Sequence, residues 1–400
     1  MSDPWRAEQL DAADRIAGLR ERFSLPADVI YLDGNSLGPL PAHVAERVDR
    51  TIREEWGRHL IAAWTSDGWW SAPTRVGDRI GRLIGAAPGQ TVVGDSTSVQ
   101  LFNALVAAAR LRPGRGIVVI DSIHFPTDRY MAASVARLLD LRVIAVPAAA
   151  LDATLHRYAE DIAVVAFGAV DYRTGELHDI ATITRAVHHV GAVAVWDLCH
   201  AVGAVPLDVD TADVDLAVGC TYKYLCGGPG APAFIYVAQR HQAAFDHPLI
   251  GWNGHMDPFA METEYRPSDG IARARIGTPH ILSLSALDAA LDVFDDVDIG
   301  TVREKSLGLA DYFLDELDEI VSSGALDLVT PREHSRRGNQ LTFRYDDADA
   351  IEMALRRKGI ICDVRPPNLV RFAFNGLFLS YADIHRAADS VRGISHSTRE

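Results

Sequence analysis

The sequence predicts an α/β protein of two domains, a larger one on a mostly parallel sheet and a smaller α+β one near the C-terminus. The chain has 400 residues, more than one hydrophobic core usually serves. Between about residues 90 and 240, short continuous apolar runs alternate with segments of helical periodicity. This is typical of strands buried on both faces and joined by helical crossovers. We expect an N-terminal segment packing with the small domain (1–60), the large domain (61–281) and the small domain (282–400).

Each expected element follows from its local pattern. Trp5–Phe23 places apolar residues at helical spacing with charges between them, so one helix is expected there. Turn-forming residues fill Tyr31–Pro41. The large domain is expected to contain helices Ser98–Leu111 and Ile180–His189 and the strands Thr91–Val93, Ile117–Ile120, Val143–Val146, Ala163–Phe167, Ala192–Trp196, Leu216–Val218 and Phe234–Val237. The small domain is expected to contain helices Leu284–Val297, Val302–Val321 and Ser380–Arg392 and strands Gln340–Tyr345, Ile360–Val364 and Leu369–Phe374.

The bulk composition narrows the classes of function. The formal net charge is −15 and the cations are scattered, which argues against nucleic acid or an anionic membrane as a partner. No run reaches about 18 apolar residues, and Met1–Leu10 lacks the apolar core of a signal peptide. The cysteines form no CxxC pair, so a disulfide framework is not expected, no metal site is predicted, and a cytoplasmic location is expected. The four cysteines are Cys199, Cys220, Cys226 and Cys362.

An aspartate stands at the carboxyl end of one expected strand. Asp197 follows the apolar run Ala192–Trp196, and His200 lies three residues further on. In open α/β sheets, ligands bind beyond the carboxyl ends of the strands. A buried carboxylate there needs a partner, because desolvation favours its neutral form, and a protonated ring nitrogen would supply one. The alternative is an aspartate that caps a helix.

A lysine follows the next apolar run. Lys223 comes after Leu216–Val218 and is flanked by tyrosines. A lysine in apolar surroundings can have a pKa well below about 10.4 and act as a nucleophile; the alternative is a lysine that reaches water from a sheet edge. Asp197 precedes it by 223 − 197 = 26 residues, with one crossover between them. Neighbouring strand ends would then bring both groups to one crevice, and pyridoxal-5′-phosphate (PLP) chemistry needs such a pair: a lysine for the aldehyde and an acid to keep the pyridine nitrogen protonated.

A phosphate site is predicted earlier in the chain. Thr91–Val93 is followed by a polar turn and a helix, so Thr97 and Ser98 would offer hydroxyl and amide donors at a helix N-terminus. Plain helix capping is the alternative. Phe125 lies just past another strand end and could stack on a cofactor ring. The glycine-rich segment Cys226–Pro232 matches neither GxGxxG nor GxxxxGK[ST], so it is not read as a nucleotide loop.

The motifs around these residues resemble those of the kynureninase family, whose members have the fold-type I fold of PLP-dependent transferases. The resemblance runs from about residue 30 to about 390, and it implies the PLP cofactor and a large domain followed by a small α+β domain. The segments that carry it are Tyr31–Gly38, His124–Asp128, Trp196–Gly203, Tyr222–Gly230, Gly251–His255, Gly277–Pro279 and Arg365–Phe372.

The resemblance also implies residue roles. Lys223 would bind the cofactor and shuttle a proton, Asp197 would pair with the pyridine nitrogen, and Tyr222 is a candidate proton donor. Arg371 would hold the substrate α-carboxylate, a task suited to a bidentate guanidinium. The remaining cofactor contacts would come from Thr97, Ser98, Phe125, Asp128 and His200, with Trp252 and Thr278 from the second subunit of a homodimer, and the remaining substrate contacts from Asn35, Trp64 and Gly277.

The implied reaction is hydrolytic cleavage of the Cβ–Cγ bond of L-kynurenine to anthranilate and L-alanine, in tryptophan breakdown or in a biosynthetic pathway. Trp64 and the Gly277-Thr278 pair resemble the bacterial type, which prefers L-kynurenine over its 3-hydroxy relative. Several residues depart from the family pattern and put the substrate, rather than the cofactor, in question. They are Gly168, Ala169, Asp171, Cys226, Asn253 and Phe374.

Three alternative functions stay open at this stage. A kynureninase-like enzyme could act on a substituted kynurenine. A cysteine desulfurase or selenocysteine lyase would need a nucleophilic cysteine, and Cys362 follows an apolar pair in an expected strand, where a thiol is inert. A PLP-fold regulatory protein would bind the cofactor without turnover.

Overall fold

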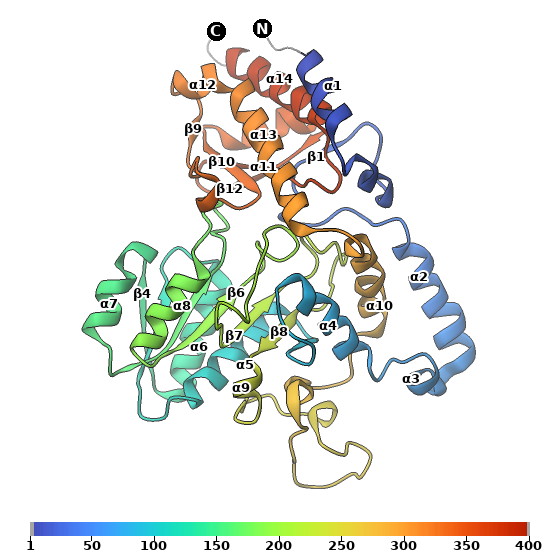
Figure 1. The fold of residues 1–400 in the computed structure, drawn as a ribbon, viewed down its shortest axis with the longest axis vertical. Coiled ribbons are helices and arrows are strands. Elements are labelled where there is room, and N and C mark those ends of the chain that lie inside the picture. Colours follow the sequence, from blue (N-terminus) through green and yellow to red (C-terminus); the bar gives the residue numbers. More distant parts are fainter. Residues whose placement is uncertain (1–3, 398–400) are drawn as a thin grey trace.

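A computed structural model describes residues 4–397, so residues 1–3 and 398–400 of the expected terminal segments lie outside it. The larger of its sheets has seven strands in the order β2-β8-β7-β6-β5-β3-β4 (Figure 1). Strand β8 is antiparallel to β2 and β7, and the remaining neighbours are parallel. The predicted mostly parallel α/β sheet is therefore confirmed. Its strands are β2 (Thr91–Val93), β3 (Ile117–Asp121), β4 (Arg142–Val146), β5 (Ile162–Gly168), β6 (Val193–Asp197), β7 (Leu216–Gly219) and β8 (Phe234–Val237).

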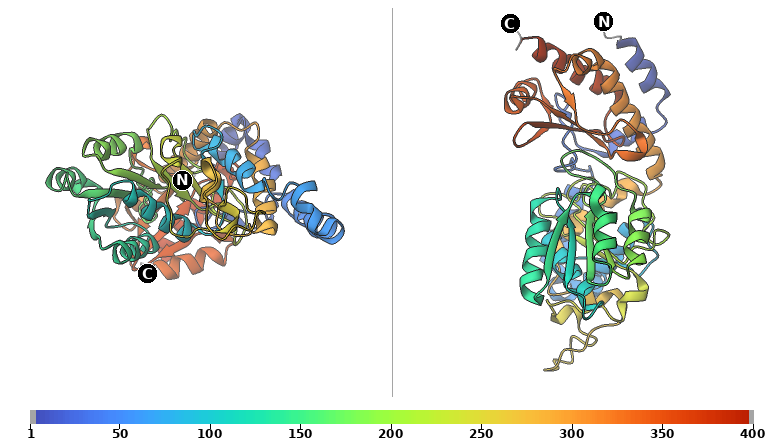
Figure 2. Two further views of the ribbon diagram at one scale, coloured as in Figure 1. Left: turned by 90° about the horizontal axis from the view of Figure 1, so that it is seen from below. Right: turned by 90° about the vertical axis from the view of Figure 1, so that its left-hand side faces the viewer.

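The large sheet is buried on both faces because its strands are apolar at successive positions. In β3, Val118 and Ile120 belong to one hydrophobic cluster, whereas Ile117 and Val119 belong to another. Successive side chains of a strand point to opposite faces, so the two clusters are the two sides of the sheet. Helices cover both sides (Figure 2). The helices around this sheet are α4 (Ala72–Leu83), α5 (Thr97–Arg110), α6 (Pro126–Leu139), α7 (Leu151–Arg157), α8 (Ile180–His189) and α9 (Gln239–Gln242).

A second sheet lies at the other end of the molecule, beside both termini (Figure 1). Its four strands are antiparallel, in the order β12-β13-β10-β9, and strand β1 (Ile30–Tyr31) pairs in parallel with β11 (Ile360–Ile361). Helix α1 (Pro4–Ala13) packs on α14 (Tyr381–Ser397). The other elements of this part are α11 (Ile299–Glu316), α12 (Asp318–Ser322), β9 (Asp327–Leu328), β10 (Gln340–Arg344), α13 (Ala348–Arg356), β12 (Asp363–Arg365) and β13 (Leu369–Ala373).

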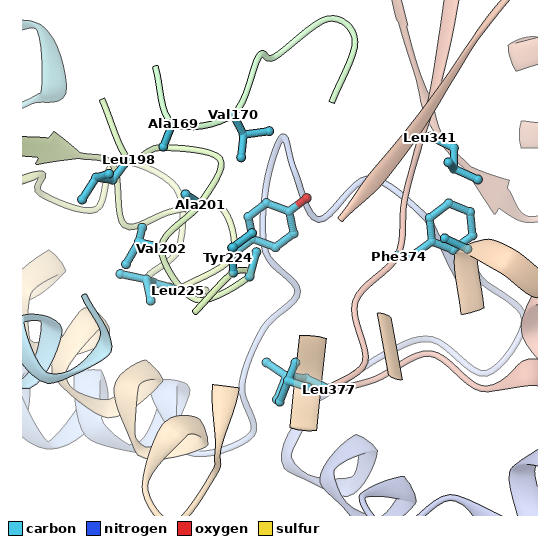
Figure 3. Packing of buried hydrophobic residues seen from close by; sticks show 14 of the residues in the cluster. Ala169, Val170, Leu198, Ala201, Val202, Tyr224, Leu225, Leu341, Phe374 and Leu377 are labelled. Atoms are coloured by element: carbon cyan, nitrogen blue, oxygen red, sulfur yellow. The ribbon is translucent and has the colours of Figure 1, made fainter. Parts of the chain in front are cut away.

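One continuous hydrophobic cluster joins the two sheets. Figure 3 shows Leu198 and Leu225 on the side of the large sheet and Leu341 and Phe374 on the side of the small one, with Tyr224 between them. Helix α2 (Val44–Arg50) packs on α10 (Ile281–Ala290), which also contacts α4. The proposed domain boundaries near residues 60 and 282 stay a prediction. The segment between α2 and α4 contains the π-helical turn Thr51–His59 and α3 (Ala63–Ser66).

The expectation of one helix over Trp5–Phe23 is wrong. Helix α1 ends at Ala13, and a 3-10 turn follows over Ala17–Arg22. Two contacts of Asp14 explain the break: its carboxylate accepts from the Ile16 amide (3.0 Å) and forms a buried ion pair with Lys305 (2.7 Å). A side chain that bonds its own backbone competes with the helix.

The long helix expected over Val302–Val321 is also interrupted, at Leu317. The guanidinium of Arg392 donates to the Glu316 carbonyl (2.7 Å), which provides a partner for a backbone group at the helix end. The strand expected over Ile360–Val364 is split at Cys362 into β11 and β12, which belong to different sheets. Over the described residues, every helix is too short or too polar to cross a bilayer.

Candidate active site

The carboxyl ends of β3, β5, β6 and β7 open into a cavity of about 250 Å³. Eight of the predicted catalytic and cofactor-binding residues line it. The lining consists of these eight, Thr97, Ser98, Phe125, Asp128, Asp197, His200, Tyr222 and Lys223, together with Asp121, His124, Thr127, Gly168, Val170, Asp171, Tyr172 and Cys199.

Lys223 reaches the cavity from the loop that follows β7. Its Nζ lies 2.8 Å from Nε2 of His200 and 5.9 Å from the ring centroid of Tyr222. Burial, and then the nearby charge of Lys223, lowers the pKa of His200 well below its usual value. A neutral imidazole has a free nitrogen lone pair, so His200 accepts a hydrogen bond from the amine and holds its direction.

Asp197 is the last residue of β6, the strand next to β7, and it lies beside Asp128 and His124. Ligand atoms of these three side chains lie within 4.8 Å of one another. Burial, and then the charge of Asp197, raises the pKa of Asp128 to about 6. Nδ1 of His124 lies 3.0 Å from Asp128 Oδ2 and accepts from the Phe125 amide (2.8 Å). The cluster therefore favours holding a proton, or facing a cation, near neutral pH.

The predicted phosphate-binding residues lie at the first turn of α5. Ser96 is the N-cap, and its hydroxyl accepts from the Val99 amide (3.4 Å). Thr97 and Ser98 line the cavity rather than serving as the cap. The amide dipoles at a helix N-terminus favour an anion, so this end of the cavity suits phosphate.

Phe125 precedes α6 and is 44 % exposed. The ring meets Tyr172 edge to face, with centroids 5.2 Å apart. One face of a ring held in this way can pack against a planar ligand in the cavity.

Arg371 does not line the cavity. Its side chain is 0 % exposed, donates to Asp363 through Nε (2.7 Å) and Nη2, and donates to the Tyr172 carbonyl through Nη1. Strand pairing explains the ion pair, because Asp363 and Arg371 are direct partners of β12 and β13. Asn35 is also buried and donates to Gln340 Oε1 (3.0 Å).

Trp64, Trp252, Gly277 and Thr278 lie away from the Lys223 cavity of their own chain. Trp64 and Trp252 meet edge to face, with centroids 6.3 Å apart, in a group of aromatic rings. Gly277 and Thr278 are exposed and line a separate small cavity. Within one chain, the structure therefore brings together the Lys223 group and leaves these four residues apart from it.

Several lining residues were missed by the sequence interpretation. Asp121 is the last residue of β3, and His124 follows three residues later, immediately before Phe125, so their position after an apolar strand was an available signal. Tyr172 offered no such signal. It lies in the loop after β5, and only the fold brings its carbonyl to Arg371 and its side chain to the cavity.

Solved structures share the fold at low sequence identity. A cysteine desulfurase from Thermococcus onnurineus superposes with a TM-score of 0.81 at 17 % identity, covering 95 % of this chain and 98 % of that one. A cysteine desulfurase from Escherichia coli gives a TM-score of 0.80 at 17 % identity, over 100 % and 99 % of the two chains. Likeness at this identity concerns the fold.

Sequence relatives are much more similar. The chain is 46 % identical over 97 % of its length to a kynureninase of Deinococcus radiodurans, covering 95 % of that protein. It is 44 % identical over 96 % of its length to a kynureninase of Burkholderia pseudomallei, covering 94 % of that protein. Residues 302–391 match the family description of the kynureninase C-terminal domain. The chain therefore belongs to the kynureninase family.

Proposed function

We propose that this protein is a PLP-dependent hydrolase that cleaves L-kynurenine to anthranilate and L-alanine. The observation that carries the proposal is the presence of Lys223 and Asp197 on one cavity, at the ends of paired parallel strands, in a chain with full-length kynureninase relatives. The reaction fits tryptophan breakdown or a biosynthetic pathway. The four cysteines are buried and unpaired, which supports a cytoplasmic location.

The residues of the cavity fit PLP. Among the described residues, Asp171 Oδ2 and His200 Nδ1 are buried polar atoms of the cavity lining without a hydrogen-bond partner. Such atoms are costly unless a ligand or solvent satisfies them. The phosphate would meet the first turn of α5 at Thr97 and Ser98, the ring would pack on Phe125, and the pyridine nitrogen would face Asp197 and Asp128. Tyr222 and His200 would complete the contacts.

When bound, PLP supplies an electron sink that makes bonds next to the substrate's amino-bearing carbon labile. Lys223 is the amine that would bind the cofactor and then move the Cα proton. Asp197 would hold the proton on the pyridine nitrogen, with Asp128 as a second carboxylate that shares it. His200 would direct Nζ of Lys223 through the 2.8 Å contact. Burial raises the pKa of Tyr222, so its hydroxyl keeps its proton at neutral pH and can donate it.

The substrate contacts form the second half of the proposal. Arg371 would hold the α-carboxylate, which fixes the bond that breaks relative to the cofactor plane. Asp363 now occupies its Nε and Nη2 donors, so substrate binding would require the Arg371–Asp363 pair to rearrange or to share a donor. Asn35, Trp64 and Gly277 would contact the remainder of the substrate.

A homodimer would complete each site. Trp252 and Thr278 would reach the partner's cavity, which is consistent with their exposure and with their distance from the Lys223 cavity of their own chain. Exposed apolar side chains near Trp252 would then be buried in the interface. They are Met256, Phe259 and Met261.

Anthranilate fluorescence tests the function directly. Purified protein should release anthranilate and L-alanine in equal amounts from L-kynurenine, and a panel of ring-substituted kynurenines ranks alternatives by kcat/KM. A preferred substituted compound would revise the substrate. Cofactor retention without turnover of any panel member would instead support a regulatory role.

A further inference from the structure

Two segments that carry Trp252 and Thr278 are packed backbone to backbone. A Cβ atom at Gly251 would lie 2.2 Å from the Ile276 carbonyl oxygen, and one at Gly254 would lie 2.4 Å from that of Arg275. Both distances are far below van der Waals contact, so the turn 251–254 can lie this close to segment 275–278 only with glycine at both ends.

Asn253 ties the same two segments together from inside the turn. Its side chain is buried, and its Nδ2 donates to the Gly277 carbonyl (2.9 Å). Its backbone amide donates to the Ile276 carbonyl (3.2 Å). Two successive carbonyls of the segment that leads into Thr278 are thus held by the residue that follows Trp252.

The side-chain oxygen of Asn253, Oδ1, has polar neighbours. Asn253, Gln100 and Arg275 line a cavity of about 20 Å³, enough for one water molecule. Their buried atoms Asn253 Oδ1, Gln100 Oε1 and Arg275 Nε have no protein hydrogen-bond partner within residues 4–397. A side chain that both donates and accepts suits this position.

We propose that Asn253 is a positioning residue that fixes Trp252 and Thr278 as one unit against the partner's cofactor cavity. The inference rests on the proposed function, because it takes from it the PLP cofactor and the contribution of these two residues across the dimer. Asn253 itself lies beside neither the cofactor cavity nor Lys223, so it acts through the segment that it holds.

Cofactor affinity is the first readout, because it does not depend on turnover. Asn253→Asp keeps the shape of the side chain but replaces its donor with an oxygen that repels the Gly277 carbonyl, and Asn253→Ala removes both the donor and the acceptor. We expect the PLP dissociation constant, measured by fluorescence on the apoprotein, to rise about tenfold in both variants. Asn368→Asp makes the same exchange at a half-buried turn residue and should leave the affinity unchanged, and the thermal midpoint of each apoprotein monitors folding.

Mixed dimers then test whether Asn253 of one chain affects the cofactor site of the other chain. A Lys223→Ala chain paired with an Asn253→Asp chain has one site with Lys223, and this site takes its Trp252 and Thr278 from the chain with intact Asn253. It should bind PLP with wild-type affinity and show about half of the wild-type activity. With both substitutions on one chain and a wild-type partner, the one site with Lys223 receives the altered unit and should bind PLP about tenfold more weakly.

The outcomes separate the two proposals. Turnover that survives Lys223→Ala in a homodimer contradicts the proposed function. Loss of turnover in that homodimer, with unchanged PLP affinity in both Asn253 variants, overturns the role of Asn253 and leaves the function intact. If PLP affinity fell in the mixed dimer with the two substitutions on different chains, and stayed at the wild-type value with both on one chain, Asn253 would act on the site of its own chain.

Discussion

Strands β6 and β7 have a cluster of aspartate and histidine side chains at each end. The two clusters differ in how fully their polar atoms are hydrogen-bonded and in the direction in which the pKa of an aspartate is shifted. At the carboxyl ends, Asp197 lies with His124 and Asp128 on a cavity. At the amino ends, the buried Asp215 lies between His188 and His241. Both groups are carboxylate–histidine clusters, and in each the aspartate stands at an end of β6 or β7.

The amino-end cluster is saturated with hydrogen bonds. Asp215 accepts from the Ala194 amide (2.7 Å) and Arg240 (2.7 Å), and it pairs with His188 (2.8 Å) and His241 (2.7 Å). Burial would raise the pKa of Asp215, but the contacts with His188 and His241 outweigh it and hold that pKa well below its usual range.

The carboxyl-end cluster lacks this saturation. Among the described residues, Asp171 Oδ2 and His200 Nδ1 beside this cluster on the cavity have no hydrogen-bond partner, and burial beside Asp197 raises the pKa of Asp128 to about 6. The comparison teaches that residue type and burial do not identify a ligand site. A cluster whose donors and acceptors satisfy one another stabilises the fold, whereas one left unsatisfied at the open end of a sheet is available to a ligand.

The largest expected effect is on catalysis at the open end. Asp197→Asn removes the charge proposed to face the pyridine nitrogen while keeping the side-chain shape. We expect kcat/KM for L-kynurenine to fall about 100-fold or more, with a thermal midpoint near that of the wild type. Steady-state kinetics and thermal unfolding measure the two quantities, and a variant with wild-type kinetics would remove Asp197 from the mechanism.

The matched change at the saturated end should affect stability instead. Asp215→Asn leaves His188, His241 and Arg240 without their buried anion, and the free energy of unfolding should fall by about 2–4 kcal/mol. Urea unfolding measures this loss. Activity per folded molecule should be unchanged, and a loss of kcat/KM similar to that of Asp197→Asn would erase the distinction between the two clusters.

The saturated cluster also predicts the pH dependence of stability. The depressed pKa of Asp215 gives stability that is present above about pH 4 and is lost as pH falls further. The contact with Asp215 raises the pKa of His188, so its contribution is full below about pH 6.5 and is lost as pH rises through the raised value. The stability difference between wild type and Asp215→Asn should therefore peak near pH 5–6 and shrink on both sides; a difference that is flat from pH 3 to 9 would contradict this account.

A smaller effect is expected at Gly168. A Cβ atom there would lie 3.1 Å from His124 Nε2, so Gly168→Ala must displace that ring slightly. PLP affinity should fall about threefold to tenfold in Gly168→Ala, but not when the same change is made in a His124→Ala background. Equal losses in both backgrounds would show that His124 is not the residue displaced.

The smallest effect is expected at Cys362. This thiol is 1 % exposed, and burial raises its pKa, so it is a poor nucleophile. Cys362→Ala should leave kynurenine turnover unchanged, and neither protein should release sulfide from L-cysteine. Sulfide release that Cys362→Ala abolishes would favour a desulfurase.

Much of the fold could be predicted because continuous apolar runs identify buried strands. The expected runs Ile117–Ile120 and Phe234–Val237 agree with β3 and β8 within one residue, and α8 spans Ile180–His189 as expected. The breaks at Asp14 and Leu317 could not be predicted from periodicity. They coincide with contacts to Lys305 and Arg392, which are distant in sequence.

The candidate site divides in the same way. Asp197 and Lys223 could be placed together because consecutive parallel strands align their carboxyl ends. The pairing of Arg371 with Asp363 was missed, although the turn residues Pro366, Pro367 and Asn368 between them suggest a hairpin that sets the two opposite each other. The roles of Trp252 and Thr278 stay predictions, since they concern a second chain.

Chemical trapping of the bound cofactor tests the central claim most directly. Borohydride reduction of the purified holoprotein, followed by proteolysis and mass spectrometry, would identify the lysine that carries PLP. The account predicts a pyridoxyl group on the peptide that contains Lys223 and none on peptides with the chain's other lysines, Lys305 and Lys358. A label on either of these, or an unlabelled Lys223 in protein that retains PLP, would contradict it.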